Sequence, residues 1–239
     1  MQNNPYKLVA LLPMKAHSSR VTSKNFRLFA GRPLFRWILD ALLEVEAIEK
    51  IVINTDARNL LRQHGMPEND RILIRDRPQE ICGTTVSMNR VIEDDLEAVS
   101  SELYLMTHAT NPLLRSTTIS SALECYRKKS GDGYDSLFTV NEMQTRFYRD
   151  DGSPVNHDPD NLVPTQDLEV WYEENSNLYA FTKDSFERTN ARIGSNPVMY
   201  TTPHLESFDI DDVTGWHLAE IVALSRFVSA SAEAYQKSL

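Results

Sequence analysis

The first 39 residues contain no acidic side chain, although the protein as a whole is acidic. The chain has 239 residues, with 34 Asp and Glu against 25 Lys and Arg, and a net charge of −9. Seven cations precede Asp40, and because these contribute +7 to the total of −9, the remaining residues together carry −16. A field of that sign repels nucleic acid, so a basic start on an acidic chain favours a small anion as the ligand.

Cysteine is scarce, and long hydrophobic runs are missing. Cys82 and Cys125 are too few for a four-cysteine metal cage or a disulfide framework. The first apolar run, Leu8 to Leu12, is far shorter than the roughly 20 residues of a membrane-spanning helix, and it is too short for a secretory signal. These absences predict a soluble cytoplasmic protein without a membrane partner, and the length fits one domain over residues 1–239.

The loop after the first apolar run lacks the common glycine-rich phosphate-binding patterns. Neither GxxxxGK[ST] nor GxGxxG is present, which argues against a P-loop ATPase and against a classical dinucleotide fold. The loop carries cations, hydroxyls and an amide: Lys15, Ser18, Ser19, Arg20, Thr22, Ser23, Lys24 and Asn25. Side chains, more than a backbone nest, would have to neutralise a polyphosphate here. From composition alone, a solvated basic surface loop explains the stretch equally well.

Apolar runs alternate with helical periodicity along most of the chain, which predicts a largely parallel, three-layer α/β domain. The expected strands are 8–12, 50–55, 71–74, 102–108, 135–140, 176–183 and 197–201. One expected helix begins at Pro33, and the others cover 58–64, 86–99, 118–129, 184–190 and 213–228.

Residues 141–174 interrupt this alternation. The segment is polar, contains Pro and Asp, and is too long for an ordinary connection. We therefore expect it to be irregular and to serve as a lid or as an arm for a second subunit.

The opening stretch LLPMKAHSSRVTSKNFRLFAGRPLFRWILDALL resembles the start of the acylneuraminate cytidylyltransferases, the CMP-sialic acid synthetases. The family pattern is kept at Ser18, Lys24, Asn25, Gly31, Pro33 and Leu34, whereas Lys15 stands at the signature arginine. Four further motifs match in the family's order: RDRPQEI, THATNPLLR, ENSNLYAF and SFDIDD. The five motifs occur in the family's order along nearly the whole chain. The resemblance therefore favours a nucleotide site over a solvated surface loop.

The resemblance implies a Rossmann-like nucleotidyltransferase domain and a specific reaction. The anomeric hydroxyl of a 2-keto sugar acid would attack the α-phosphorus of CTP and release pyrophosphate. Such chemistry needs positioning and charge neutralisation more than covalent help. Lys24 would be the catalytic cation on the phosphates. The implied nucleotide-binding residues are Lys15, Ser18, Arg20, Lys24, Asn25, Arg77, Ser87 and His108.

The motif SFDIDD suggests a metal site. Asp209 and Asp211 lie two residues apart, so their side chains share one face of an extended stretch. Paired carboxylates facing a triphosphate can hold Mg²⁺. Taken alone, such a pair is more often a solvated strand end; the resemblance favours the metal and makes both aspartates catalytic. Asp212 is interpreted as a cap of the last helix.

The resemblance also implies sugar contacts and an assembly. His108, Asn175 and Tyr179 would contact the sugar, although His108 replaces the family's glutamine. Arg146 and Arg149 could meet the acceptor's carboxylate across a subunit boundary of a homodimer, with residues 141–174 as the dimerisation arm. His108 is explained nearly as well by a satisfied strand-end histidine, and Tyr179 by a core residue.

Two other functions remain open from the sequence. One is an enzyme like the CMP-3-deoxy-manno-octulosonate synthetases, whose loop usually reads Gly-Lys-Pro where this chain has Ser23, Lys24 and Asn25. The other is a catalytically silent nucleotide-binding scaffold, because Lys15, His108 and Ser176 replace an arginine, a glutamine and a glycine of the family pattern.

Overall fold

The computed structural model describes residues 5–18, 21–83 and 85–237, and the backbone alone beyond residue 226. These residues form a seven-stranded sheet in the order β5-β4-β1-β6-β8-β7-β9. β5, β4, β1 and β6 are parallel, β8 is antiparallel to both β6 and β7, and β9 is parallel to β7. The strands are β1 Tyr6–Leu11, β4 Lys50–Thr55, β5 Ile72–Asp76, β6 Ser101–Met106, β7 Ser136–Met143, β8 Trp171–Phe181 and β9 Pro197–Thr201. The predicted α/β fold with a mostly parallel sheet is confirmed.

Helices connect the strands. They are α1 Leu34–Glu44, α2 Arg58–Gln63, α3 Met88–Ala98, α4 Ser116–Ser130, α5 Lys183–Thr189 and α6 Val213–Lys237. Short 3₁₀ turns cover Lys24–Phe26 (η1), Gln79–Ile81 (η2), Thr165–Asp167 (η3) and His204–Glu206 (η4), and a small ribbon pairs β2 Leu28–Phe29 with β3 Arg32–Pro33. α6 continues nine residues beyond the expected end at Val228. Among the described residues, no helix is long and apolar enough to cross a bilayer.

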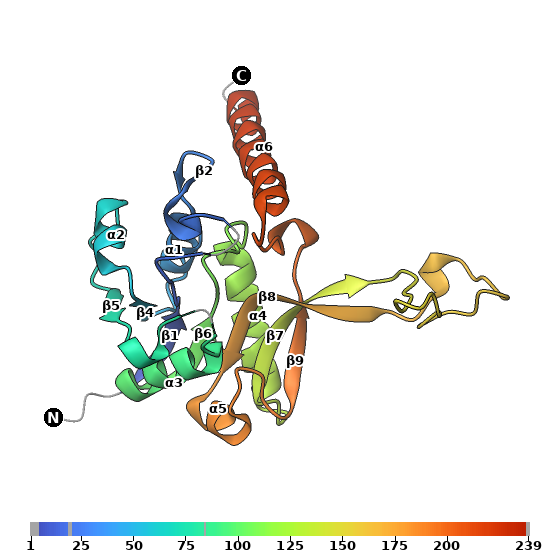
Figure 1. Ribbon diagram of the computed structural model, residues 1–239, viewed down its shortest axis with the longest axis horizontal. Coiled ribbons are helices and arrows are strands. Elements are labelled where there is room, and N and C mark those ends of the chain that lie inside the picture. The colour runs from blue at the N-terminus through green and yellow to red at the C-terminus, as the bar shows by residue number, and fades with distance from the viewer. Residues whose placement is uncertain (1–4, 19–20, 84, 238–239) are drawn as a thin grey trace.

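The central strands are buried on both faces. Leu8 and Ala10 of β1 pack into one core with residues of α1 and α4, whereas Val9 and Leu11 pack into a second core with residues of α3 and α5. A strand covered on both sides needs apolar residues at every position, which explains its continuous apolar run. The result is three layers, with helices on either side of the sheet (Figure 1).

The prediction of an irregular segment over residues 141–174 is wrong at both ends. β7 continues to Met143 and β8 begins at Trp171, and these two residues pair. The paired strands leave the body of the protein as a projecting arm (Figure 1). The first four residues of β8 are exposed, so they lack the apolar alternation by which a half-buried strand is recognised.

Candidate active site

A cleft lies at the carboxyl ends of β1 and β6, between the loop after β1 and the start of α3. Open α/β sheets bind their ligands at this edge. The residues predicted to bind the nucleotide converge there from distant parts of the sequence. Those that line the cleft are Lys15, Ser18, Lys24, Asn25, Arg77 and His108. Arg20 lies outside the described residues.

The loop that carries Lys24 is closed by its own side chains. Ser23 adopts a left-handed conformation with φ of 52°, which turns the chain into η1. The buried Asn25 donates from Nδ2 to the carbonyl oxygen of Lys15 at 3.0 Å. Asn25 therefore shapes the loop, and Lys24 follows directly from the turn.

Lys24 contacts the segment that carries the two aspartates. Its Nζ donates a hydrogen bond to the carbonyl oxygen of Ile210. Ile210 is fully buried in a cluster with Leu34 and Trp216, and its backbone N–H donates to the carbonyl of Thr110 at 2.9 Å. Because Ile210 points into the core, its neighbours on either side, Asp209 and Asp211, are exposed. The fold thus brings the cation of the first loop to the backbone between the two aspartates, neither of which is among the described residues that line the cleft.

The chemistry of this pair fits a divalent cation shared with a ligand. Within the described residues, no group of three or more His, Cys, Asp or Glu side chains is arranged to hold a metal ion. Mg²⁺ commonly uses one or two carboxylates, phosphate oxygens and water. Asp212 has the role expected of it, because its Oδ1 accepts from the backbone N–H of Gly215 at 2.7 Å at the start of α6.

Arg77 lines the cleft, but its hydrogen bonds organise the neighbouring chain. Its Nη2 donates to the carbonyls of Asn54 at 2.8 Å and Met14 at 3.2 Å, and its Nε donates to Asn54 Oδ1 at 2.9 Å. The amide of Asn54 in turn donates to Asp94 at 2.8 Å and to Asp95 at 2.9 Å. Burial raises the pKa of Asp95 to about 6 and outweighs its hydrogen bonds with Asn54 and the cation of Arg75. A contact between Arg77 and the nucleotide stays a prediction.

His108 is neutral. Burial lowers its pKa to about 3, and the charges of Arg192 and Lys24 contribute in the same direction. Its Nε2 lies 3.3 Å from Nη1 of Arg192. A neutral histidine has one donor and one acceptor nitrogen and carries no charge. His108 can therefore hydrogen-bond a ligand but adds no positive charge to the cleft.

Arg192 was not anticipated from the sequence. Its guanidinium lies 3.9 Å from the centroid of the Tyr179 ring, and its Nη2 is 3.5 Å from Oε1 of Glu174. The Tyr179 hydroxyl donates to the same Glu174 carboxylate, and Ser176 Oγ lies 3.2 Å from the Tyr179 oxygen. Burial, the largest cause, raises the pKa of Tyr179. Arg192 follows α5 in a loop without a recognisable motif, so no local signal distinguishes it from a surface arginine.

The other predicted residues have mixed positions. Ser87 caps α3 by accepting from the N–H of Asn89 at 3.3 Å, and its neighbours Val86 and Met88 line the cleft while Ser87 does not. Asn175 is buried, and its Nδ2 donates within the fold, to Asn141 Oδ1 at 3.0 Å and Thr202 Oγ1 at 2.7 Å.

Arg146 and Arg149 lie on the projecting arm, outside the residues that line the cleft. Arg146 donates from Nη2 to the carbonyl of Val163 at 2.6 Å, a contact within the arm. Their role with the acceptor, like that of Asn175, stays a prediction.

A family model for cytidylyltransferases matches residues 9–233. The chain belongs to the cytidylyltransferase family. This cytidylyltransferase is 26% identical to the CMP-N,N'-diacetyllegionaminic acid synthase of Legionella pneumophila over 227 residues, which cover 90% of this chain and 95% of that one. It is 24% identical to the N-acylneuraminate cytidylyltransferase of Escherichia coli and 25% identical to that of Oncorhynchus mykiss, of which the match covers 51% and 49%. The chain thus spans about half the length of the latter two relatives.

Solved structures agree on the fold of the cytidylyltransferase. A 4-diphosphocytidyl-2C-methyl-D-erythritol synthase from Anaerococcus prevotii superposes with a TM-score of 0.64 at 14% identity, over 91% of this chain and 99% of that one. A CMP:2-keto-3-deoxy-manno-octonic acid synthetase complexed with CTP gives a TM-score of 0.61 at 14% identity, over 92% of this chain and 98% of that one. At this identity the likeness concerns the fold alone.

Proposed function

We propose that this cytidylyltransferase transfers CMP from CTP to the anomeric hydroxyl of a nonulosonic acid, a sialic-type 2-keto sugar acid. A bond forms between the anomeric oxygen and the α-phosphorus, and the bond from that phosphorus to the bridging oxygen breaks. Pyrophosphate leaves, and the hydroxyl proton passes to water. The product would be a CMP-sugar for a surface glycan.

The contact between Lys24 and the Ile210 carbonyl carries the proposal. A triphosphate in the cleft needs cations on its oxygens, and Lys24 meets this need at a point flanked by Asp209 and Asp211. Lys15 lines the same cleft and adds a second positive charge, while Ser18 offers a hydroxyl. These groups act by positioning the triphosphate and neutralising its charge.

Asp209 and Asp211 would hold Mg²⁺. When bound, the ion would neutralise phosphate charge and orient the phosphate oxygens. The two aspartates flank the residue that Lys24 contacts, so an ion held by them would have hard oxygen ligands from the protein and from CTP.

The name of the Legionella relative and those of the N-acylneuraminate enzymes support a nonulosonic acid as acceptor. A pseudaminic acid cytidylyltransferase of Campylobacter jejuni is also similar, at 20% identity over 90% of this chain. These relatives are named for different acids of one chemical class. We therefore propose a nonulosonic acid as acceptor without naming an individual acid.

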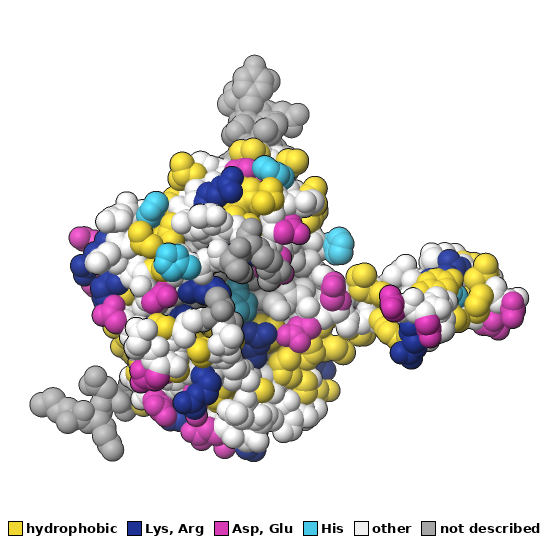
Figure 2. Space-filling view, in the orientation of Figure 1, with side chains coloured by type: hydrophobic (Ala, Val, Ile, Leu, Met, Phe, Trp, Pro, Cys, Tyr) yellow, Lys and Arg dark blue, Asp and Glu magenta, His cyan; other side chains and the backbone are white. Residues whose placement is uncertain are grey.

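A homodimer is part of the proposal. The exposed apolar side chains of the arm are Tyr148, Leu162, Val163, Trp171 and Tyr172. Figure 2 shows yellow, hydrophobic atoms along the arm. Such residues suit contact with a second copy, which would also offer Arg146 and Arg149 a route to the partner's cleft.

The test is pyrophosphate release by the purified protein with CTP, Mg²⁺ and a panel of acids. The panel contains neuraminic, legionaminic and pseudaminic acids, and also 3-deoxy-manno-octulosonic acid. We expect turnover with at least one nonulosonic acid and little with the octulosonic acid. Turnover with the octulosonic acid alone would replace the proposed acceptor, and no turnover with any acid, despite CTP binding, would support the silent scaffold.

A further inference from the structure

Arg192 joins two parts of the site that are far apart in the sequence. His108 follows β6, whereas Arg192 follows α5, and Nη1 of Arg192 lies 3.3 Å from Nε2 of His108. On its other side, the guanidinium stacks at 3.9 Å over the Tyr179 ring. The side chain of Arg192 is 22% exposed, so it lies at the edge of the site and not on the open surface.

The chemistry of this contact decides where the His108 proton resides. Arginine has only N–H donors and cannot accept a hydrogen bond. In a hydrogen bond with Arg192, Nε2 of His108 must therefore be the acceptor, and in a neutral ring the proton must then be on Nδ1. His108 is among the residues that line the cleft, so the ring that carries this proton belongs to the site.

We propose that Arg192 is a positioning residue that fixes His108 as the neutral Nδ1–H tautomer, and so determines that His108 donates a hydrogen bond to an oxygen of the bound ligand. The identity of that ligand, CTP or the sugar acid, rests on the proposed function; the tautomer does not. A donor-only imidazole would favour an acceptor such as a phosphate, carboxylate or carbonyl oxygen over a hydroxyl that needs an acceptor.

The Arg192 side chain is held in place by contacts with Glu174 and Tyr179. Glu174 contacts both the Arg192 guanidinium, at 3.5 Å, and the Tyr179 hydroxyl. The ring and the carboxylate thus fix the plane and the end of the guanidinium, in a combination of cation–π and ionic contacts.

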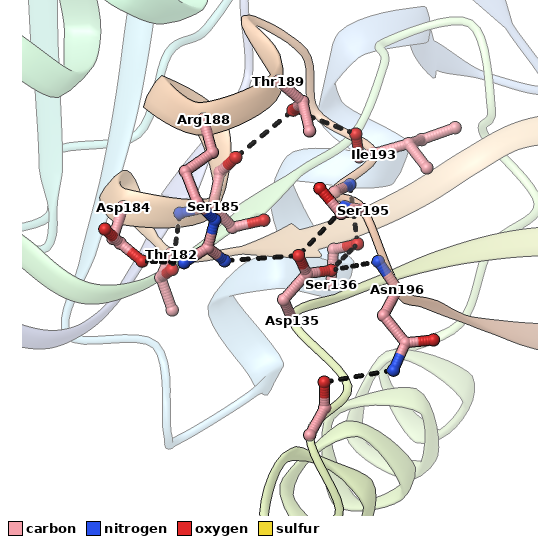
Figure 3. Close-up of polar contacts among 12 residues, drawn as sticks. Asp135, Ser136, Thr182, Asp184, Ser185, Arg188, Thr189, Ile193, Ser195 and Asn196 are labelled. Atoms are coloured by element: carbon pink, nitrogen blue, oxygen red, sulfur yellow. Dashed lines mark hydrogen bonds and ion pairs between the residues drawn. The ribbon is translucent and has the colours of Figure 1, made fainter.

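The segment that follows Arg192 is anchored by Asp135, which contacts Ser195 and Asn196 (Figure 3). The Asp135 carboxylate accepts from the backbone N–H groups of Ser195 at 2.9 Å and Asn196 at 3.0 Å. Gly194 allows this approach, because a Cβ there would lie 2.3 Å from Oδ1 of Asp135. The backbone that follows Arg192 is therefore fixed by hydrogen bonds, which supports a positioning role.

The charges around His108 favour its neutral form. Lys24 approaches from η1 and Arg192 from the loop after α5, and both act to lower the His108 pKa, although burial is the largest cause. Glu174 of β8 contacts the hydroxyl of Tyr179, which lies on the same strand. Glu174 also pairs with Arg192. Removal of Arg192 should therefore raise the pKa of His108 but leave it below that of an exposed histidine.

The experiment reads the tautomer directly by NMR of ¹⁵N-labelled histidine, with His108→Gln used to assign the signal. In the wild type we expect a protonated Nδ1 and an unprotonated Nε2, unchanged between pH 6 and 8. In Arg192→Met we expect a shift toward the Nε2–H form and a loss of kcat/KM of about tenfold. Arg192→Lys retains a donor and should restore part of both.

A double-mutant cycle separates positioning from a direct or structural role. If Arg192 acts through His108, Arg192→Met should cost less than about twofold in kcat/KM when His108 is already Gln. Arg127→Met, an exposed arginine on α4, serves as the matched control and should change neither the NMR signal nor the rate.

Two results would overturn the proposal. One is a wild-type His108 with its proton on Nε2, and the other is a full loss from Arg192→Met in the His108→Gln background. Absence of turnover with every acid would contradict the proposed function instead, and the NMR measurement would still decide the tautomer.

Discussion

The ammonium group of Lys24 donates a hydrogen bond to the backbone carbonyl of Ile210, the residue between Asp209 and Asp211. The two partners are 186 positions apart in the sequence, so the whole fold must form before they meet. The contact places a cation from the first loop at the backbone between the two aspartates. In the proposed function, a triphosphate would lie here between positive side chains and a divalent ion.

Asp211→Asn should lower the rate of Mg²⁺-dependent pyrophosphate release by at least about a hundredfold, because an amide is a weak ligand for Mg²⁺. The measurement is turnover against Mg²⁺ concentration. Asp212→Asn is a matched control one residue away. Asn caps helices as well as Asp does, so the control should retain both its rate and its stability. Equal losses in the two variants would refute the metal assignment.

Asp95 should make the protein less stable as the pH rises. Its pKa of about 6 in the folded protein lies above its ordinary value of 3.8, so its protonation stabilises the folded state below that ordinary value. This contribution is lost as the pH rises through 6, and from pH 5.5 to 7.5 it should fall by about 1 kcal/mol.

Urea unfolding of the wild type and Asp95→Asn at several pH values isolates this effect. The variant cannot titrate at residue 95, so its stability relative to the wild type should increase across the same pH range. Asp94→Asn is the comparison, because Asp94 pairs with Arg75 at 2.8 Å but is more exposed than Asp95. A constant difference between wild type and Asp95→Asn would show that Asp95 is already ionised at pH 5.5.

The sheet was predictable because its strands are defined by local sequence. β4 and β9 have the predicted bounds, since each is a short β-rich run between polar or turn-forming residues. The outer part of β8 was missed because solvent covers it, and its sequence carries no apolar alternation.

The candidate site shows the same division. Lys24 and Asp211 are found from motifs, whereas the link between them is made by a backbone carbonyl, which leaves no mark on the identity of Ile210. Arg192 was missed for a related reason. Its contact with His108 joins residues 84 positions apart, and a loop arginine looks the same whether it faces water or an imidazole.

Ser176→Gly should stabilise the protein. The backbone of Ser176 is left-handed, with φ of 56°, in the place where the sequence resemblance has a glycine. Glycine adopts this conformation without the penalty of a Cβ. Ser176→Ala retains that penalty and also removes the hydroxyl that lies 3.2 Å from the Tyr179 oxygen. We expect the Ser176→Gly variant to exceed the Ser176→Ala variant in unfolding free energy by about 1 kcal/mol in urea denaturation. Equal stability of the two variants would mean that the strain is negligible.

Asp135→Ala should loosen the loop that carries Arg192. The carboxylate accepts two backbone hydrogen bonds, from Ser195 and Asn196, and its loss should cost about 1–3 kcal/mol. Hydrogen exchange of the Ser195 and Asn196 amides should accelerate. Asp184→Ala is the control, since Asp184 is exposed and pairs with Arg188 at 2.5 Å. Its exchange at these two amides should match the wild type. Unchanged exchange in Asp135→Ala would show that Asp135 does not anchor the loop that carries Arg192.

The arm provides a test of the proposed homodimer. Leu162 is 63% exposed on the arm, and Leu28 is 64% exposed on β2. If the arm contacts a second copy, Leu162→Asp places a charge in an apolar interface and should weaken dimerisation by at least about tenfold. Leu28→Asp introduces the same charge at an equally exposed leucine and should have no such effect.

Light scattering over a range of protein concentrations measures both variants. We expect the wild type and Leu28→Asp to have twice the mass of the chain, and Leu162→Asp to dissociate on dilution. Since Arg146 and Arg149 lie on this arm and not in the chain's own cleft, a dimer that depends on the arm is also required for them to meet the acceptor. A monomeric, fully active wild type would therefore exclude both the dimer and that role of the two arginines.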